Sequence, residues 1–204
     1  HTAKHFVLQL GSLVSLYLSL AFLLVLLFGL INLAVPDAAD GAWMTNSAAS
    51  SVRIGIAMTI VFFPTYLILT RKVNGIRRQE QGTYLTLTKW LIYLSLLVGG
   101  AVLLGDAVAV IYNFLEGETT TRFLLKALLL AGVITTAFVY YLLDARGYWQ
   151  AHERHSLYYG AGAALVVIAA LAWGITNIDS PAEVREMKLD EQQINDLTDI
   201  QYRI

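Results

Sequence analysis

Five long apolar stretches dominate this chain, and they restrict it to a membrane-spanning fold. They cover about residues 6–35, 54–70, 90–114, 122–143 and 157–175. A helix needs about 20 apolar residues to cross the ~30 Å hydrocarbon core of a bilayer. Because 57% of the 204 residues are hydrophobic and 14% are charged, a soluble fold could not cover the apolar surface. We therefore predict an all-α fold, with five transmembrane helices in residues 1–178.

The basic residues predict how this bundle is oriented. One side of the predicted membrane receives Lys4, Arg71, Lys72, Arg77, Arg78, Lys89, Arg146 and Arg154, whereas the loops of the other side carry Asp37, Asp40, Glu116 and Glu118. Basic loops stay in the cytoplasm, so the N-terminus is predicted to be cytoplasmic and the C-terminus exported. We also expect Arg71, Lys72, Arg77 and Arg78 to contact anionic lipid head groups, at about 1 kcal/mol per basic residue.

Local features refine the first two spans. The first apolar run is too long for a signal peptide, so an uncleaved helix is expected. Ser12, Ser15 and Ser19 recur at helical spacing within it, which fits either close helix packing or a polar pore lining. Residues 36–51, rich in Ala, Ser, Asp and Gly, are predicted to form a loop, and Pro64 is predicted to kink the second helix.

The segment after the last span, residues 179–204, is predicted to be an exported amphipathic helix. Ser180 fits the N-cap and Pro181 the first helical position. Glu183 fits the third helical position, where its side chain would return to the N-cap and complete a capping box. An apolar stripe follows at roughly helical spacing, formed by Met187, Ile194, Leu197 and Ile204. An isolated amphipathic helix is marginal in water, so the stripe predicts docking on a following domain, on a neighbouring subunit or on the membrane. The acidic residues opposite argue against anionic lipid.

Asp106 is the most informative polar residue of the predicted spans. It lies about 16 residues, or roughly 24 Å of helix, beyond Trp90, and therefore inside the bilayer. A charge at that depth costs on the order of 2–3 kcal/mol, so it should find a partner or water. Lys126 is the expected partner, with Arg122 next to it. Two interpretations stay open, namely a structural pair that locks two helices and an aqueous path that binds or relays a cation or proton.

Enzymatic motifs are not found in the sequence. There is no HExxH zinc helix and no GxSxG nucleophile elbow. Asp106 follows Leu104-Gly105, which lacks the first glycine of the intramembrane aspartyl protease context. The chain has no cysteine, and His152 and His155 lack a third metal ligand. We therefore predict no catalytic residue, no metal and no cofactor, and nothing indicates nucleic-acid binding.

Several short motifs are shared with one group of proteins. They are Lys-Trp-Leu-Ile-Tyr-Leu at 89–94, Gly-Asp at 105–106, Glu-Thr-Thr-Thr-Arg-Phe at 118–123 and Tyr-Tyr-Leu-Leu-Asp at 140–144. This pattern resembles a family of bacterial multi-spanning membrane proteins with a domain of unknown function, and the likeness extends more loosely from Leu10 to the end of the fourth span. The resemblance implies the same topology in a bacterial cytoplasmic membrane, and it implies no activity.

The exported tail carries a second resemblance. Members of that family often continue after the last helix with an Arg…Asp…Asp-Leu…Ile-Gln pattern, which Arg185, Asp190, Asp196-Leu197 and Ile200-Gln201 match. The pattern is also similar to the helix that enters a pilin-like domain. It implies that a soluble domain follows Ile204.

Two non-enzymatic functions follow as hypotheses. In the first, the chain forms a homo-oligomer that passes or gates a small ion around Asp106, Lys126 and Arg122. In the second, it is an accessory or scaffold subunit of a larger membrane complex and docks through the exported helix.

Overall fold

The chain folds into helices only, and each is built from the residues that the apolar pattern favours. The computed structural model describes residues 2–79 and 83–204. Over these residues the helices are α1 (Thr2–Ala34), α2 (Ala42–Gln79), α3 (Thr83–Glu116), α4 (Thr121–Ala145), the short α5 (Tyr148–Ala151), α6 (Glu153–Thr176) and α7 (Pro181–Tyr202). Within this part of the chain, five helical segments are long and apolar enough to cross a membrane, which makes it a multi-span membrane protein. The fifth, Glu153–Tyr202, includes both α6 and α7.

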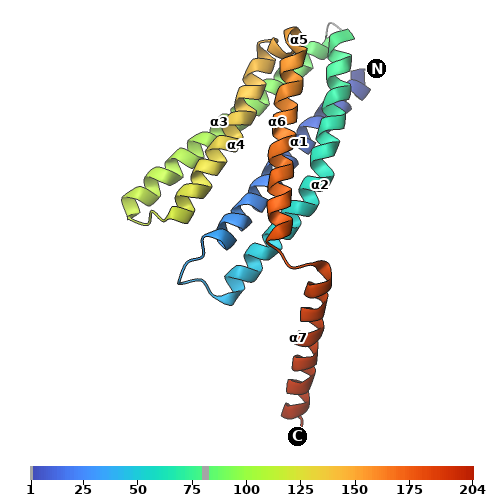
Figure 1. The fold of residues 1–204 in the computed structure, drawn as a ribbon. Coiled ribbons are helices and arrows are strands. Elements are labelled where there is room, and N and C mark those ends of the chain that lie inside the picture. The colour runs from blue at the N-terminus through green and yellow to red at the C-terminus, as the bar shows by residue number, and fades with distance from the viewer. Residues whose placement is uncertain (1, 80–82) are drawn as a thin grey trace.

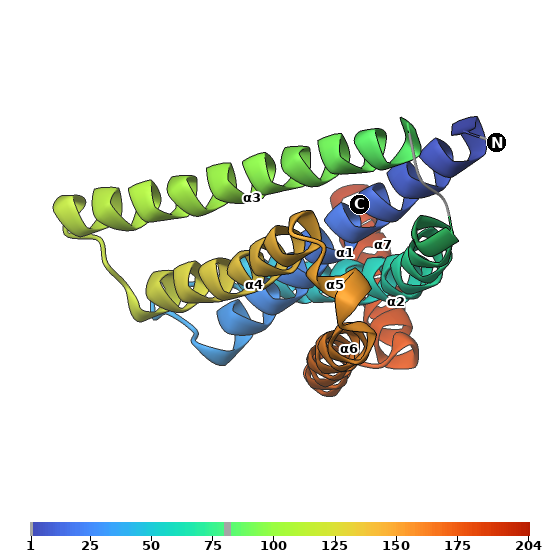
Figure 2. The ribbon, with the colours of Figure 1, turned by 90° about the horizontal axis from the view of Figure 1, so that it is seen from above.

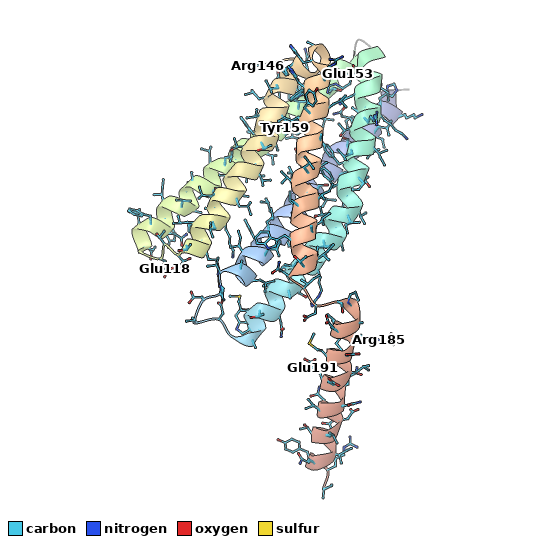
Figure 3. All side chains as sticks on the ribbon, in the orientation of Figure 1. Glu118, Arg146, Glu153, Tyr159, Arg185 and Glu191 are labelled. Atoms are coloured by element: carbon cyan, nitrogen blue, oxygen red, sulfur yellow. The ribbon has the colours of Figure 1, made fainter. Side chains whose placement is uncertain are left out.

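The two ends of the bundle differ in what they contain. Figure 1 shows the N-terminus, the end of α2, the start of α3 and α5 at one end, while the α1–α2 and α3–α4 connections lie toward the other. Figure 3 shows Arg146 and Glu153 at the first end and Glu118 on the α3–α4 connection. The segments that carry the predicted cytoplasmic basic residues therefore share one end of the bundle.

The core is centred on α1. About 56% of its apolar window is buried, against 6% for α3, and α1 packs against α2, α3, α4 and α6. Seen from above, α3 lies at one edge and α6 at the opposite edge, with α1, α2 and α4 between them (Figure 2). The fully buried side chains of Leu26, Leu30 and Val52 mark the centre of the core.

Two glycines bring three helices together at Leu26. A Cβ at Gly55 of α2 would lie 2.6 Å from the Leu26 Cβ and 2.8 Å from its Cα, and a Cβ at Gly174 of α6 would lie 3.0 Å from its Cδ1. Small residues let membrane helices approach this closely, because nothing separates the backbones. The junction of α1, α2 and α6 is therefore set by positions where only glycine fits without a shift.

The helix boundaries extend beyond the predicted spans. The loop expected at residues 36–51 ends at Gly41, because α2 already begins at Ala42. The basic stretch from Arg71 is helical as far as Gln79 and again from Thr83, since it contains no proline and is rich in good helix formers. α2 also continues through Pro64. The predicted capping box of α7, with Ser180 as N-cap, is confirmed.

Candidate functional site

Asp106 lies on the side of α3 that faces α4. The α3–α4 register is given by Gly99, where an added Cβ would lie 3.4 Å from Phe138 Cδ2, and Asp106 follows Gly99 by two helical turns on the same face. This register places Asp106 level with about Ala131. The side chain is partly exposed, and its surroundings on α4 are apolar.

The predicted partners of Asp106 lie elsewhere. Lys126 is about five residues, or ~7.5 Å of helix, from the level of Asp106. Its ammonium lies 5.9 Å from the centroid of the Phe28 ring of α1, so it extends toward α1 rather than α3. Arg122 forms its ion pair with Asp40. The structure therefore does not bring together the predicted cluster of Asp106, Lys126 and Arg122, because the two basic residues are on a different side of α4.

Arg122 instead closes one end of the bundle. Its Nη2 lies 2.5 Å from Asp40 Oδ2, and its Nε and Nη2 donate to the Val35 carbonyl at 2.9 and 2.6 Å. That carbonyl follows the C-terminus of α1, where the helix dipole favours a cation. The guanidinium of Arg122, helped by a backbone hydrogen bond from Asp37, lowers the pKa of the Asp40 carboxyl below its ordinary value.

A second ion pair closes the opposite end of α4. Arg77 Nη1 of α2 lies 3.1 Å from both carboxylate oxygens of Asp144, and the two side chains are only 8% and 7% exposed. Trp149 is buried nearby and donates from Nε1 to the Tyr140 carbonyl at 2.9 Å. Asp144 was not predicted as a partner, although the charge pattern places it on the same side of the membrane as Arg77.

This pair corrects part of the predicted lipid contact. The Arg77 side chain is turned inward to Asp144, so it is not at the lipid surface. Arg71 and Lys72 are exposed, as a head-group contact requires. The Arg78 side chain lies outside the described residues.

One face of α1 carries buried polar side chains. They are His5, Gln9, Ser12, Ser15 and Ser19, all less than 10% exposed. Ser12 and Thr70 of α2 share a hydrogen bond of 2.7 Å, and the Tyr17 hydroxyl donates to Ser95 of α3 at 2.9 Å. Sequence periodicity predicted that the three serines share a face, and the structure buries that face against α2.

The remaining candidates are exposed. The rings of Tyr148, His152 and His155 stack at the α5–α6 junction, and the Tyr148 hydroxyl lies 2.7 Å from His155 Nδ1. Among the residues that the structure describes, no group of three or more His, Asp or Glu side chains is placed to hold a metal ion. On α7, which lies wholly within the described chain, no side chain is buried, and the stripe is exposed at Met187, Ile194 and Leu197. Ile204, the fourth predicted member of the stripe, is also exposed but lies beyond the end of α7 at Tyr202.

Comparison with known proteins gives one match. A family model described as Domain of unknown function (DUF5671) matches residues 5–142, which cover most of α1, all of α2 and α3, and most of α4. No curated protein and no solved structure matches the chain.

Proposed function

The chain belongs to the DUF5671 family, and from that premise we propose that it is a non-catalytic subunit of a larger membrane complex, which it joins through α7. Its N-terminus is cytoplasmic and α7 is exported in this proposal, because the basic segments gather at the opposite end of the bundle from α7. The membrane is the cytoplasmic membrane of a bacterium, as the sequence resemblance implies.

The observation that carries this proposal is the isolation of α7. The helix has a complete capping box, in which Glu183 accepts from the Ser180 amide at 2.7 Å, and it lies clear of the five-helix bundle in Figure 1. Arg185 and Glu191 lie well away from the other helices in Figure 3. A helix of this composition is only marginally stable alone in water. Its complete N-terminal cap therefore supports the proposal that α7 is helical because it binds a partner.

The chemistry of α7 indicates the kind of partner. Its apolar stripe of Met187, Ile194 and Leu197, with Ile204 just after the helix, would lie in an apolar groove, as amphipathic helices do in protein complexes. Acidic residues accompany the stripe, namely Asp190, Glu191, Asp196 and Asp199. The partner is therefore a protein whose groove is flanked by Lys or Arg, and the anionic membrane surface is disfavoured by like charge.

The test is native mass and co-purification in mild detergent from the protein's own membranes. We expect the wild type to purify with its partner and the Ile194→Asp/Leu197→Asp variant to purify without it. Gln192→Asp is the matched control, because Gln192 is also an exposed residue of α7 but lies across the helix from Met187, Ile194 and Leu197. Retention of the partner by the double variant would contradict docking through α7.

A second proposal rests on Asp106. It is a partly buried carboxylate in a membrane span, and it belongs to neither the Arg77–Asp144 pair nor the Arg122–Asp40 pair. Ionisable residues at such depth are typical of ion pathways. In this proposal a homo-oligomer passes a small cation along α3, and Asp106→Asn abolishes cation flux into vesicles while the native mass is unchanged. Unchanged flux would exclude it.

A further inference from the structure

The buried polar face of α1 continues onto its neighbours. We define the polar seam as His5, Gln9, Ser12, Ser15 and Ser19 of α1, with Thr59 and Thr70 of α2 and Thr88 of α3. On α1 alone it extends from His5 to Ser19, or about 21 Å of helix, which is about two thirds of a ~30 Å hydrocarbon core. It stops at the apolar cluster around Leu23, Leu26 and Leu30.

Two threonines of the seam are placed against α1 by the helix registers. Thr88, Ile92 and Ser95 form one buried face of α3, and Ser95 accepts the hydrogen bond from Tyr17 of α1. Thr59 follows Gly55 by one turn of α2, and Gly55 packs on Leu26 of α1. Because α1 and α2 are antiparallel, Thr59 lies between the level of Leu26 and the Ser12–Thr70 hydrogen bond, about one helical turn beyond Ser19.

These two hydroxyl groups have no protein partner in the described part of the chain. Thr59 and Thr88 are each 1% exposed, and neither Oγ1 makes a hydrogen bond. Other helical hydroxyls of this protein bond back to the carbonyl four residues earlier, as Ser19, Thr65 and Thr136 do. An unsatisfied buried hydroxyl costs about 1–3 kcal/mol. Both hydroxyls therefore need a hydrogen-bond partner from outside the protein, and polar interiors supply water for this purpose.

We propose that the polar seam is a hydrated path, which water enters from the end of the bundle that holds His5 and follows as far as Ser19 and Thr59. The apolar cluster at Leu26 ends the path and keeps the other third of the membrane dry. The path delivers water, and protons along it, to the middle of the bilayer from one side. It does not depend on α7 or on a partner protein.

The chain offers a direct test because it contains no cysteine. Single Ser12→Cys, Ser15→Cys and Ser19→Cys variants each add one thiol of nearly the serine's size, and the infrared S–H band reports its exchange when the detergent-solubilised protein is transferred to D2O. The matched control is Ala170→Cys, in the apolar core of α6, where Ala170 is 5% exposed. We expect the three seam thiols to exchange at similar rates, at least ~10-fold faster than the control, because exchange requires contact with water.

A second variant distinguishes a hydrated seam from a dry one. Thr59→Val removes the hydroxyl without changing the side-chain shape. If the seam is hydrated, the substitution removes a partner of the water and slows exchange at Ser19→Cys several-fold. If the seam is dry, the substitution removes an unsatisfied hydroxyl and raises stability without changing exchange. Slow exchange at Ser15→Cys and Ser19→Cys, equal to that of Ala170→Cys, would overturn the proposal.

Discussion

Gly55→Ala should weaken the packing of α1 against α2. The added Cβ would meet the Leu26 Cβ at 2.6 Å and its backbone Cα and N at 2.8 Å, whereas carbon atoms in contact normally lie about 3.5–4.0 Å apart. The helices must therefore separate locally by about 1 Å, and such overpacking costs about 1–3 kcal/mol. Backbone atoms cannot rotate away, so we expect a value in the upper half of that range.

The clash is isolated by comparison with Gly132→Ala. A Cβ at Gly132 of α4 meets nothing within 4 Å, and both substitutions gain the same helix propensity, about 1 kcal/mol. The propensity gain cancels in the difference, so Gly55→Ala should have a free energy of unfolding about 2–3 kcal/mol below that of Gly132→Ala.

The assay is reversible unfolding in mixed micelles with increasing SDS, followed by circular dichroism. Equal stabilities of the two variants would show that α1 and α2 do not approach as closely as the structure indicates.

Three further predictions concern the polar ends of the bundle and α7. Asp40→Asn should lower the free energy of unfolding at neutral pH. Because the folded-state pKa of Asp40 lies below its ordinary 3.8, the difference in stability from wild type should vanish only as the pH falls below about 4. A difference in SDS unfolding that does not change with pH would contradict this. Asp144→Asn should cost about 3 kcal/mol because it removes the carboxylate charge that faces the buried Arg77 guanidinium, whereas Arg77→Met/Asp144→Leu should recover most of that stability. In the same unfolding assay, a double variant less stable than Asp144→Asn would count against the pair. Ser180→Ala should destabilise the first turn of α7 by about 1 kcal/mol, seen as faster amide hydrogen exchange at residues 182–185, and unchanged exchange would mean that the cap contributes nothing.

The sequence predicted those features that depend on local chemistry or on bulk hydropathy. The five spans follow from uninterrupted apolar length, and the N-terminus of α7 follows from Ser180, Pro181 and Glu183 at fixed spacing. Both are confirmed, because neither needs knowledge of which helices are neighbours.

The partners of the charged residues could not be predicted in the same way. α3 and α4 are apolar on every side, so their sequences do not show which side faces which neighbour. The sequence therefore indicated a depth in the membrane for Asp106 and Lys126, but not the direction in which each side chain leaves its helix. In the structure, Lys126 extends over the ring of Phe28. Asp40 and Asp144 could be recognised as ion-pair partners only from the arrangement of the helices, because the arginines that they contact are 82 and 67 residues away in the sequence.

The two ion pairs at the ends of α4 can form only late in biogenesis. Asp40 and Arg77 belong to the α1–α2 hairpin, which leaves the ribosome and enters the membrane well before Arg122 and Asp144 are synthesised. Until then both charges lie at the aqueous edges of the bilayer, where water solvates them. The α1–α2 hairpin therefore has no buried charge before α4 is inserted. Insertion of α4 then supplies a partner for each charge and buries Arg77 against Asp144, so a chain that stalls before α4 lacks both ion pairs.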